Sequence, residues 1–203
     1  PIKVWSYYSY YSSPTASAIQ AMQINGHKQT NDFDQDPYAE DVYKGFNWLF
    51  HGYYYSVNYQ MMRPIGITDL SKSPYGVSDI NGNGIGIEAK DYGYRPVYQG
   101  AQIMDAIIAS GTPYADSGRD FDADGDTDTY KEIIHDMAEA YYWGQDDTGS
   151  DQGGWRYSWN SDSDNSAAQW AAIGLIPAQE PGWDIVVPQW VKTQNQKWLD
   201  YSF

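Results

Sequence analysis

The sequence contains no cysteine among its 203 residues and is poor in basic residues. Without cysteine the chain has no disulfide bond, no thiolate nucleophile and no cysteine-ligated zinc site. Twelve lysines and arginines stand against 27 aspartates and glutamates, which gives a formal net charge of -15. Such a surface repels nucleic acids and anionic membranes and attracts cations, so we exclude nucleic-acid partners.

Long apolar runs are also missing from the sequence. No stretch of about 18 apolar residues occurs, so no membrane span is expected. The chain begins at Pro1 without a methionine or a signal-like segment, which fits a processed mature chain or a fragment. Acidic, cysteine-free chains rich in tyrosine and aspartate are common among secreted bacterial surface proteins, where calcium is plentiful. We therefore expect an extracellular or cell-surface location.

Tyrosine and tryptophan are abundant, at 20 and 9 residues, whereas phenylalanine occurs only five times. Tyr and Trp combine a large contact area with a polar tip, which suits interfaces, sugar-facing surfaces and cores alike. Residues 1–13, PIKVWSYYSYYSS, carry five of these aromatics without helical spacing and predict an extended aromatic arm. The arm either packs on its own domain or docks on a neighbouring subunit.

Six segments show helical patterns, at residues 14–26, 37–54, 96–110, 128–143, 164–175 and 184–200. The first, third and fifth segments share an apolar-x-Ala-apolar step, and the second and fourth begin after an Asp-Phe-Asp-x-Asp run. Such alternation is typical of stacked αα-hairpins. The sequence predicts an all-α domain of about three α/α-hairpin repeats over residues 14–203, with an insertion at about 55–95.

Three stretches resemble a known family: SPTASAIQAMQINGH and DPYAEDVYKGFNWLF in the first hairpin, and GGWRYSWNSDSDNSAAQWAAIGL in the third hairpin. They are similar to the repeats of the squalene–hopene cyclase and prenyltransferase β-subunit superfamily. The turn at residues 153–155 matches the Gly-Gly-Trp of those repeats, and Gln169-Trp170 matches their Gln-Trp pair. The resemblance covers about residues 14–54 and 96–200 and implies a partial α/α toroid.

The catalytic motifs of that superfamily are incomplete here. The cyclases use an Asp-x-Asp-Asp acid, but the nearest stretch, Asp162-Ser163-Asp164-Asn165, lacks the final aspartate. The prenyltransferases bind zinc through a set that includes cysteine, which this chain does not have. The fold is therefore expected to transfer without the chemistry.

The stretch DFDADGDTDTYKE, residues 120–132, carries the most specific chemical signal. A calcium loop of EF-hand type needs oxygen ligands at positions 1, 3 and 5, glycine at 6, a carbonyl at 7 and acids at 9 and 12. The predicted ligands are Asp120, Asp122, Asp124, the carbonyl of Asp126, Asp128 and Glu132. Position 12 is Lys131, and Glu132 lies one residue later. The alternative is a solvated acidic loop without a cation.

A second stretch, residues 79–91, has the same arrangement. Its predicted calcium ligands are Asp79, Asn81, Asn83 and Asp91, with Gly84 at position 6 and Lys90 at position 12. The site carries less charge and should bind more weakly; the alternative is a plain Asn-Gly turn. Residues 32–36 and 160–164 also alternate oxygen ligands but lack the glycine, so they are expected to cap the following helices.

The leading hypothesis is an extracellular, calcium-stabilised structural or assembly protein, as in a surface layer or filament, that self-associates through the aromatic arm and open repeat faces. A second hypothesis is a toroid enzyme of the terpene-cyclase kind, with Asp162 or Asp164 as its acid. A third is a carbohydrate-binding module that contacts polysaccharide through exposed Trp and Tyr. No catalytic residue is assigned under the leading hypothesis, and calcium is the only expected cofactor.

Overall fold

The computed structural model describes residues 11–52, 60–69, 73–90 and 93–203. Within these ranges the chain is mostly helical and includes one small sheet. The helices are α1 (Ser12–Ile24), α2 (Pro37–His51), α3 (Pro96–Ala109), α4 (Tyr130–Trp143), α5 (Asn165–Leu175) and α6 (Gln189–Ser202). The strands are β1 (Met62–Gly66) and β2 (Ile85–Ala89), and a short 3-10 helix, η2 (Pro177–Gln179), follows α5.

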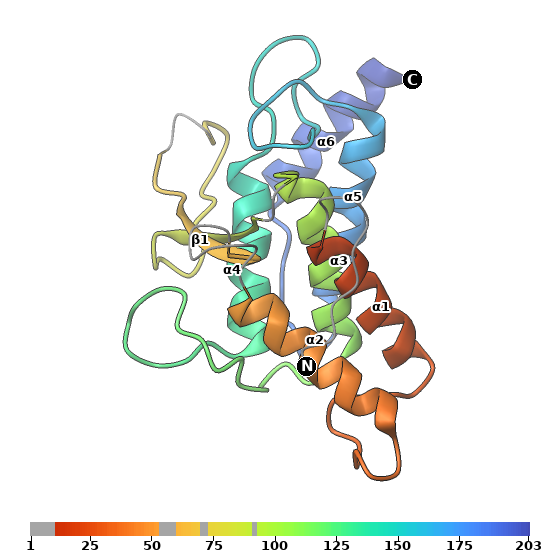
Figure 1. Cartoon of the computed structure of the whole chain (residues 1–203). Coiled ribbons are helices and arrows are strands. Elements are labelled where there is room, and N and C mark those ends of the chain that lie inside the picture. The colour runs from red at the N-terminus through yellow and green to blue at the C-terminus, as the bar shows by residue number, and fades with distance from the viewer. Residues whose placement is uncertain (1–10, 53–59, 70–72, 91–92) are drawn as a thin grey trace.

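Helix α3 is the centre of the molecule, and eleven of its 14 residues are buried. It lies between α1 and α5 in one row of helices (Figure 1). Small residues allow the close approach of α3 and α5, because a Cβ added at Gly174 would lie 3.2 Å from the Cα of Ala101. The alanine-rich step found in the first, third and fifth helical segments therefore lies on the three helices that pack side by side.

Helix α4 packs against α3 and also against strand β2. A Cβ added at Gly100 of α3 would lie 3.0 Å from the hydroxyl of Tyr141 on α4, so these two helices also approach closely. The hydroxyl of Tyr141 donates to the carbonyl of Val97 at 2.5 Å, and the indole of Trp155 donates to the carbonyl of Tyr141 at 2.9 Å. These contacts hold α4 in a fixed position, which matters because the candidate site is built on this helix.

The starts of α2 and α5 follow from their capping residues. Helix α2 begins at the predicted Pro37 because the side chain of Asp36 accepts hydrogen bonds from the backbone of Tyr38 and Ala39. The side chain of Asp164 accepts from the backbone of Ala167 at the start of α5. The capping role predicted for the 32–36 and 160–164 stretches is thus confirmed.

Several helix boundaries differ from the prediction by one to three residues, and the start of α6 differs most. Helix α6 begins at Gln189 instead of residue 184, because Pro188 is its N-cap residue in an extended conformation. Helix α1 begins at Ser12, so the predicted aromatic arm ends earlier than residue 13. The rest of that arm, residues 1–10, lies outside the described residues, and Tyr11 packs its ring 6.5 Å from that of Trp48.

The insertion between α2 and α3 contains an element that the all-α prediction did not include. Strands β1 and β2 pair antiparallel, with Met62 opposite Ala89 and Arg63 opposite Glu88. In Figure 1 this hairpin lies beside α4, on the opposite side from α1 and α5. The burial of Ile87 and Ala89 against the helices explains why so short a sheet is stable.

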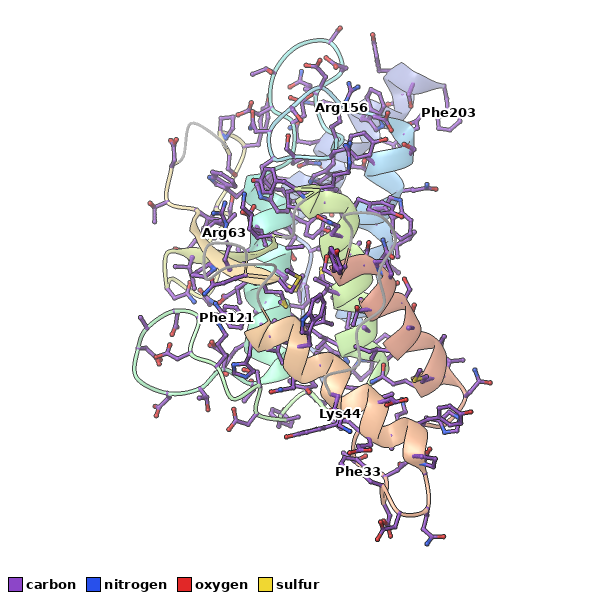
Figure 2. All side chains as sticks on the ribbon, viewed as in Figure 1. Phe33, Lys44, Arg63, Phe121, Arg156 and Phe203 are labelled. Atoms are coloured by element: carbon purple, nitrogen blue, oxygen red, sulfur yellow. The ribbon has the colours of Figure 1, made fainter. Side chains whose placement is uncertain are left out.

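Glu88 is the polar centre of this hairpin and is only 1% exposed. Its carboxylate accepts from Nε of Arg63 at 2.7 Å, from the hydroxyl of Tyr94 at 3.1 Å and from the indole of Trp159 at 2.6 Å. Arg63, labelled in Figure 2, reaches Glu88 from the neighbouring strand. One buried carboxylate therefore joins the hairpin to the loop that follows α4.

The Glu88→Gln variant is expected to lower the free energy of unfolding by about 1–2 kcal/mol, because it weakens charge-assisted hydrogen bonds in a buried network. Urea denaturation measures the loss. The matched control is Glu40→Gln, which removes the same charge from an exposed (i, i+4) pair with Lys44 and should change stability by less than about 0.5 kcal/mol. Equal losses in the two variants would contradict the importance of the Glu88 network.

Candidate metal centre

The loop at residues 120–128 turns its carboxylates inward. Asp120 accepts from the backbone N–H of Ala123 at 2.6 Å and of Gly125 at 3.2 Å. Asp122 and Asp124 each accept from the N–H two residues later, at 3.2 and 2.9 Å. Oxygen atoms of Asp120, Asp122 and Asp124 all lie within 4.8 Å of one another. The structure therefore brings together the ligands predicted at positions 1, 3 and 5.

The base of this loop is fixed to the body of the protein. Its two stems pair through hydrogen bonds from Ser117 N to Asp128 O at 3.0 Å and from Asp128 N to Arg119 O at 2.8 Å. Phe121, labelled in Figure 2, is 3% exposed and belongs to the hydrophobic core. The aspartates at the tip of the loop thus stand on an anchored base.

Asp128 and Glu132 occupy the end of the loop and the start of α4. Asp128 is buried and accepts from the N–H of Phe121 at 2.6 Å. The pKa of Asp128 is raised to about 6, mainly by burial and also by the nearby carboxylates of Asp122, Glu132 and Asp120, although the hydrogen bond from Phe121 lowers it. Glu132 forms a capping box with Thr129 and lines the same pocket.

The second predicted loop repeats the hydrogen-bond pattern of the first. Asp79 accepts from the N–H of Gly82 at 2.8 Å and of Gly84 at 3.1 Å, which are the same offsets as those of Asp120. Asn81 and Asn83 each accept from the N–H two residues later, at 3.0 and 2.9 Å. The two loops therefore share one backbone conformation at positions 1, 3 and 5. The remaining predicted ligand of this loop, Asp91, lies outside the described residues.

The two loops meet over helix α4. The pocket between them has a volume of ≈ 320 Å³. Its lining comes from three segments: Asn81 and Asn83 of the 79–84 loop; Asp122, Asp124, Asp126, Thr127 and Asp128 of the 120–128 loop; and Glu132 and Asp136 of α4. Spacing within each loop did not predict that the two would face one another.

Asp136 and Glu139 are the functional candidates that the sequence analysis missed. Asp136 is 1% exposed and accepts from the amide Nδ2 atoms of Asn81 at 2.7 Å and of Asn83 at 3.2 Å. Oε1 of Glu139 accepts from the backbone N–H of Ile80 at 2.9 Å and of Asn81 at 3.0 Å. Helix α4 thus supplies carboxylates to the loop that has few of its own.

Both of these α4 carboxylates resist ionisation in the protein without a cation. Burial raises the pKa of Asp136 to about 8, despite hydrogen bonds from Asn81 and Asn83 that lower it. Burial likewise raises the pKa of Glu139 to about 7. Oε2 of Glu139 is buried and has no hydrogen-bond partner. A bound cation would favour the ionised forms and would relieve this destabilisation.

The lysines at position 12 of each loop turn away from the centre. Lys131 forms an ion pair with Asp184 at 2.5 Å, and the ammonium of Lys90 lies 4.0 Å from the ring centre of Tyr94. Neither lysine lines the acidic pocket. An EF-hand carries an acid at position 12, whereas here the carboxylates that line the pocket beyond the loop are those of Glu132 and Asp136 on α4.

The donor set fits a hard divalent cation. Calcium takes six to eight oxygen ligands in flexible geometry, and the pocket offers carboxylates, side-chain amides and loop carbonyls. Soft metals are disfavoured because the pocket contains neither histidine nor cysteine. The observed geometry would let the residues of the 120–128 loop bind one cation, with Glu132 and Asp136 alongside.

The described tryptophans are mainly packing residues. Trp155 and Trp183 are 3% exposed, Trp198 6% and Trp48 8%, and the other described tryptophans are partly buried.

No described helix is both long and apolar enough to cross a membrane. Comparisons of the chain with protein-family models, with curated proteins and with solved structures gave no significant match.

Proposed function

We propose that this chain is an extracellular, calcium-stabilised domain with a structural or assembly role. The observation that carries the proposal is the matched geometry of two loops that meet over the acidic face of α4. Without a cation this centre concentrates carboxylates that repel one another, and those of Asp128, Asp136 and Glu139 are also buried. A cation that binds only the folded state stabilises that state by mass action.

The stapling role follows from what the loops connect. The 120–128 loop joins α3 to α4, and residues 79–84 join β1 to β2. A calcium ion at their meeting point would link the tip of the hairpin, the 120–128 loop and α4. Helices α1, α3 and α5 pack in one row. This row supports the interpretation of the helices as α/α-hairpin repeats in a partial toroid.

Self-association is the second half of the proposal. A partial ring leaves its first and last helices with faces that further repeats would cover in a closed ring. Ile176, just after α5, is 65% exposed, and Val186, just before α6, is 78% exposed. Large exposed apolar side chains favour contact with another surface. The aromatic residues that precede α1 would add to such contacts.

The enzyme hypothesis has less support. Asp164 caps α5, and the hydrogen bond from Ser166 is the main cause that lowers its pKa, which opposes a role as a proton donor. Asp162 is exposed. A proton donor of the cyclase kind needs an acid that points into an apolar cavity. The apolar pocket beside α5, lined by Trp155, Leu175 and Val187 among others, contains no carboxylate.

The proposal is tested by thermal melting and light scattering of the same protein in calcium, in magnesium and in a chelator. Calcium at about 100 times its dissociation constant stabilises by about 2.7 kcal/mol, or roughly 5–10 °C in this size range. Calcium is also expected to raise the average mass in solution. An unchanged melting temperature overturns the stapling role, and a strict monomer in calcium overturns the assembly role alone.

A further inference from the structure

The side chains of Asn81 and Asn83 contact α4 through their nitrogen atoms. Nδ2 of Asn81 donates to Oδ1 of Asp136 at 2.7 Å, and Nδ2 of Asn83 lies 3.2 and 3.3 Å from the two carboxylate oxygens of Asp136. The amide oxygens face the backbone, because Oδ1 of Asn81 accepts from the N–H of Asn83 and Oδ1 of Asn83 accepts from the N–H of Ile85. A reversed amide would set its NH2 group against these backbone donors, so the turn keeps the nitrogens on the side of Asp136.

The two loops share a backbone turn but direct different atoms inward. Asp122 and Asp124 each use one carboxylate oxygen for the turn and retain a second oxygen, so they can hold the turn and a cation together. In the 79–84 loop the corresponding second atom of each side chain is an amide nitrogen, whose hydrogens carry partial positive charge. The 120–128 loop therefore offers oxygens to the pocket, whereas the 79–84 loop offers hydrogen-bond donors.

The backbone of the 79–84 loop also donates to α4. The N–H groups of Ile80 and Asn81 donate to Oε1 of Glu139 at 2.9 and 3.0 Å. Every hydrogen bond that the structure describes between this loop and α4 thus runs from a loop donor to a helix carboxylate. The loop is arranged to hold anionic side chains, and the cation falls to the 120–128 loop.

Asp136 lies between the two loops. It is 1% exposed, accepts from the asparagines of one loop, and lines the pocket with Asp122 and Asp124 of the other. A side chain that binds a metal is commonly oriented by a hydrogen bond from a residue behind it, and loss of that residue typically weakens metal binding roughly 10- to 100-fold. Asn81 and Asn83 stand in this relation to Asp136.

We propose that Asn81 and Asn83 are positioning residues, which orient Asp136 as a ligand for the cation of the 120–128 loop and bind no cation themselves. The inference rests on the proposed calcium function, and it differs from the sequence-based expectation that these asparagines bind a second cation. The coupling is reciprocal, because a contact that tightens calcium binding is itself tightened by calcium to the same degree. Calcium at one loop would thereby hold the tip of the β1–β2 hairpin through the other.

The test is a double-mutant cycle on calcium affinity, measured by calorimetry with chelator-stripped protein. The Asn81→Ser, Asn83→Ser variant keeps a side-chain oxygen for each turn N–H but loses the donors to Asp136, so it should weaken calcium binding about tenfold. In protein that already carries Asp136→Ala, the same two changes should alter the affinity by less than about twofold. Additive losses, or an unchanged affinity of the serine variant, would overturn the proposal.

The matched control is Asn31→Ser. Nδ2 of Asn31 also donates to a carboxylate, that of Asp36 at 2.9 Å, but neither residue lines the acidic pocket. This variant loses the same kind of hydrogen bond and should leave calcium affinity unchanged. Equal weakening by the control and the serine variant would overturn the positioning role, because calcium binding would then follow the general stability of the fold.

The number of bound calcium ions is a second readout, which decides the matter even if the Asp136→Ala variant does not fold. The unaltered protein and the Asn81→Ser, Asn83→Ser variant should bind the same number of calcium ions. Loss of one ion in the variant would assign a cation to the 79–84 loop and would overturn this inference alone. Absence of saturable binding to the unaltered protein would overturn the proposed function itself.

Discussion

Replacing Asp122 and Asp124 together by asparagine is expected to raise the melting temperature of the calcium-free protein and to abolish most of its stabilisation by calcium. Each asparagine can still accept the backbone N–H that the aspartate accepts, so the turn is preserved. The variant relieves carboxylate repulsion in the free loop but removes ligands for the cation. Calcium should therefore lose most of its roughly 5–10 °C effect.

The matched control is the double variant Asp32→Asn and Asp34→Asn. This variant removes the same charge from another stretch of alternating aspartates, residues 32–36, and it keeps Asp36, the residue that caps α2. Its response to calcium should equal that of the unaltered protein. If the two double variants respond alike, calcium acts on the net charge of the chain and not on the 120–128 loop.

The stability of the calcium-free protein is expected to fall as the pH rises from about 5 to about 8. The pKa values of Asp128, Glu139 and Asp136 lie at about 6, 7 and 8 in the folded state. Unfolded, these groups have pKa values near about 4. The folded state therefore binds more protons in this window, and the contribution of these groups is complete below about pH 4 and lost as pH rises through the folded values. With screening allowed for, we expect a loss of at least about 2 kcal/mol, or roughly 5 °C.

Saturating calcium should reverse this dependence, because the cation favours the ionised carboxylates and releases their protons. Melting curves at several pH values, with chelator and with calcium, measure both trends. Asp105→Asn is the control: burial raises the pKa of Asp105 on α3 to about 6, and it does not line the acidic pocket. That variant should reduce the pH dependence but leave the calcium response intact. A calcium-free protein that is as stable at pH 8 as at pH 5 would contradict the pKa assignments.

Much of the helical structure could be predicted from local signals. Pro37 after Asp36 fixes the start of α2, and the apolar spacing from Tyr130 to Tyr141 fixes α4. The ligands at positions 1, 3 and 5 of each loop were predictable because their spacing determines which side chains turn inward. Local signals therefore suffice where the chain contacts itself over a few residues.

The remaining features depend on contacts between distant residues. The pairing of β1 with β2 is set by the burial of Ile87 and Ala89 on helices far along the chain, so the pattern of the insertion alone did not predict it. The roles of Asp136 and Glu139 likewise require residues 79–84 to lie over α4. One signal was present in the sequence: Glu132, Asp136 and Glu139 are spaced by four and three residues, which places them on one helix face.

Calorimetric titration of calcium into the chelator-stripped protein at about pH 8, where the acidic centre is most ionised, tests the central claim most directly. We predict saturable binding of at least one calcium ion per chain, with a dissociation constant of about 10⁻⁵–10⁻³ M, and at least tenfold weaker binding in the Asp122→Asn, Asp124→Asn variant. Absence of saturable binding to the unaltered protein, or undiminished binding to the variant, would contradict it.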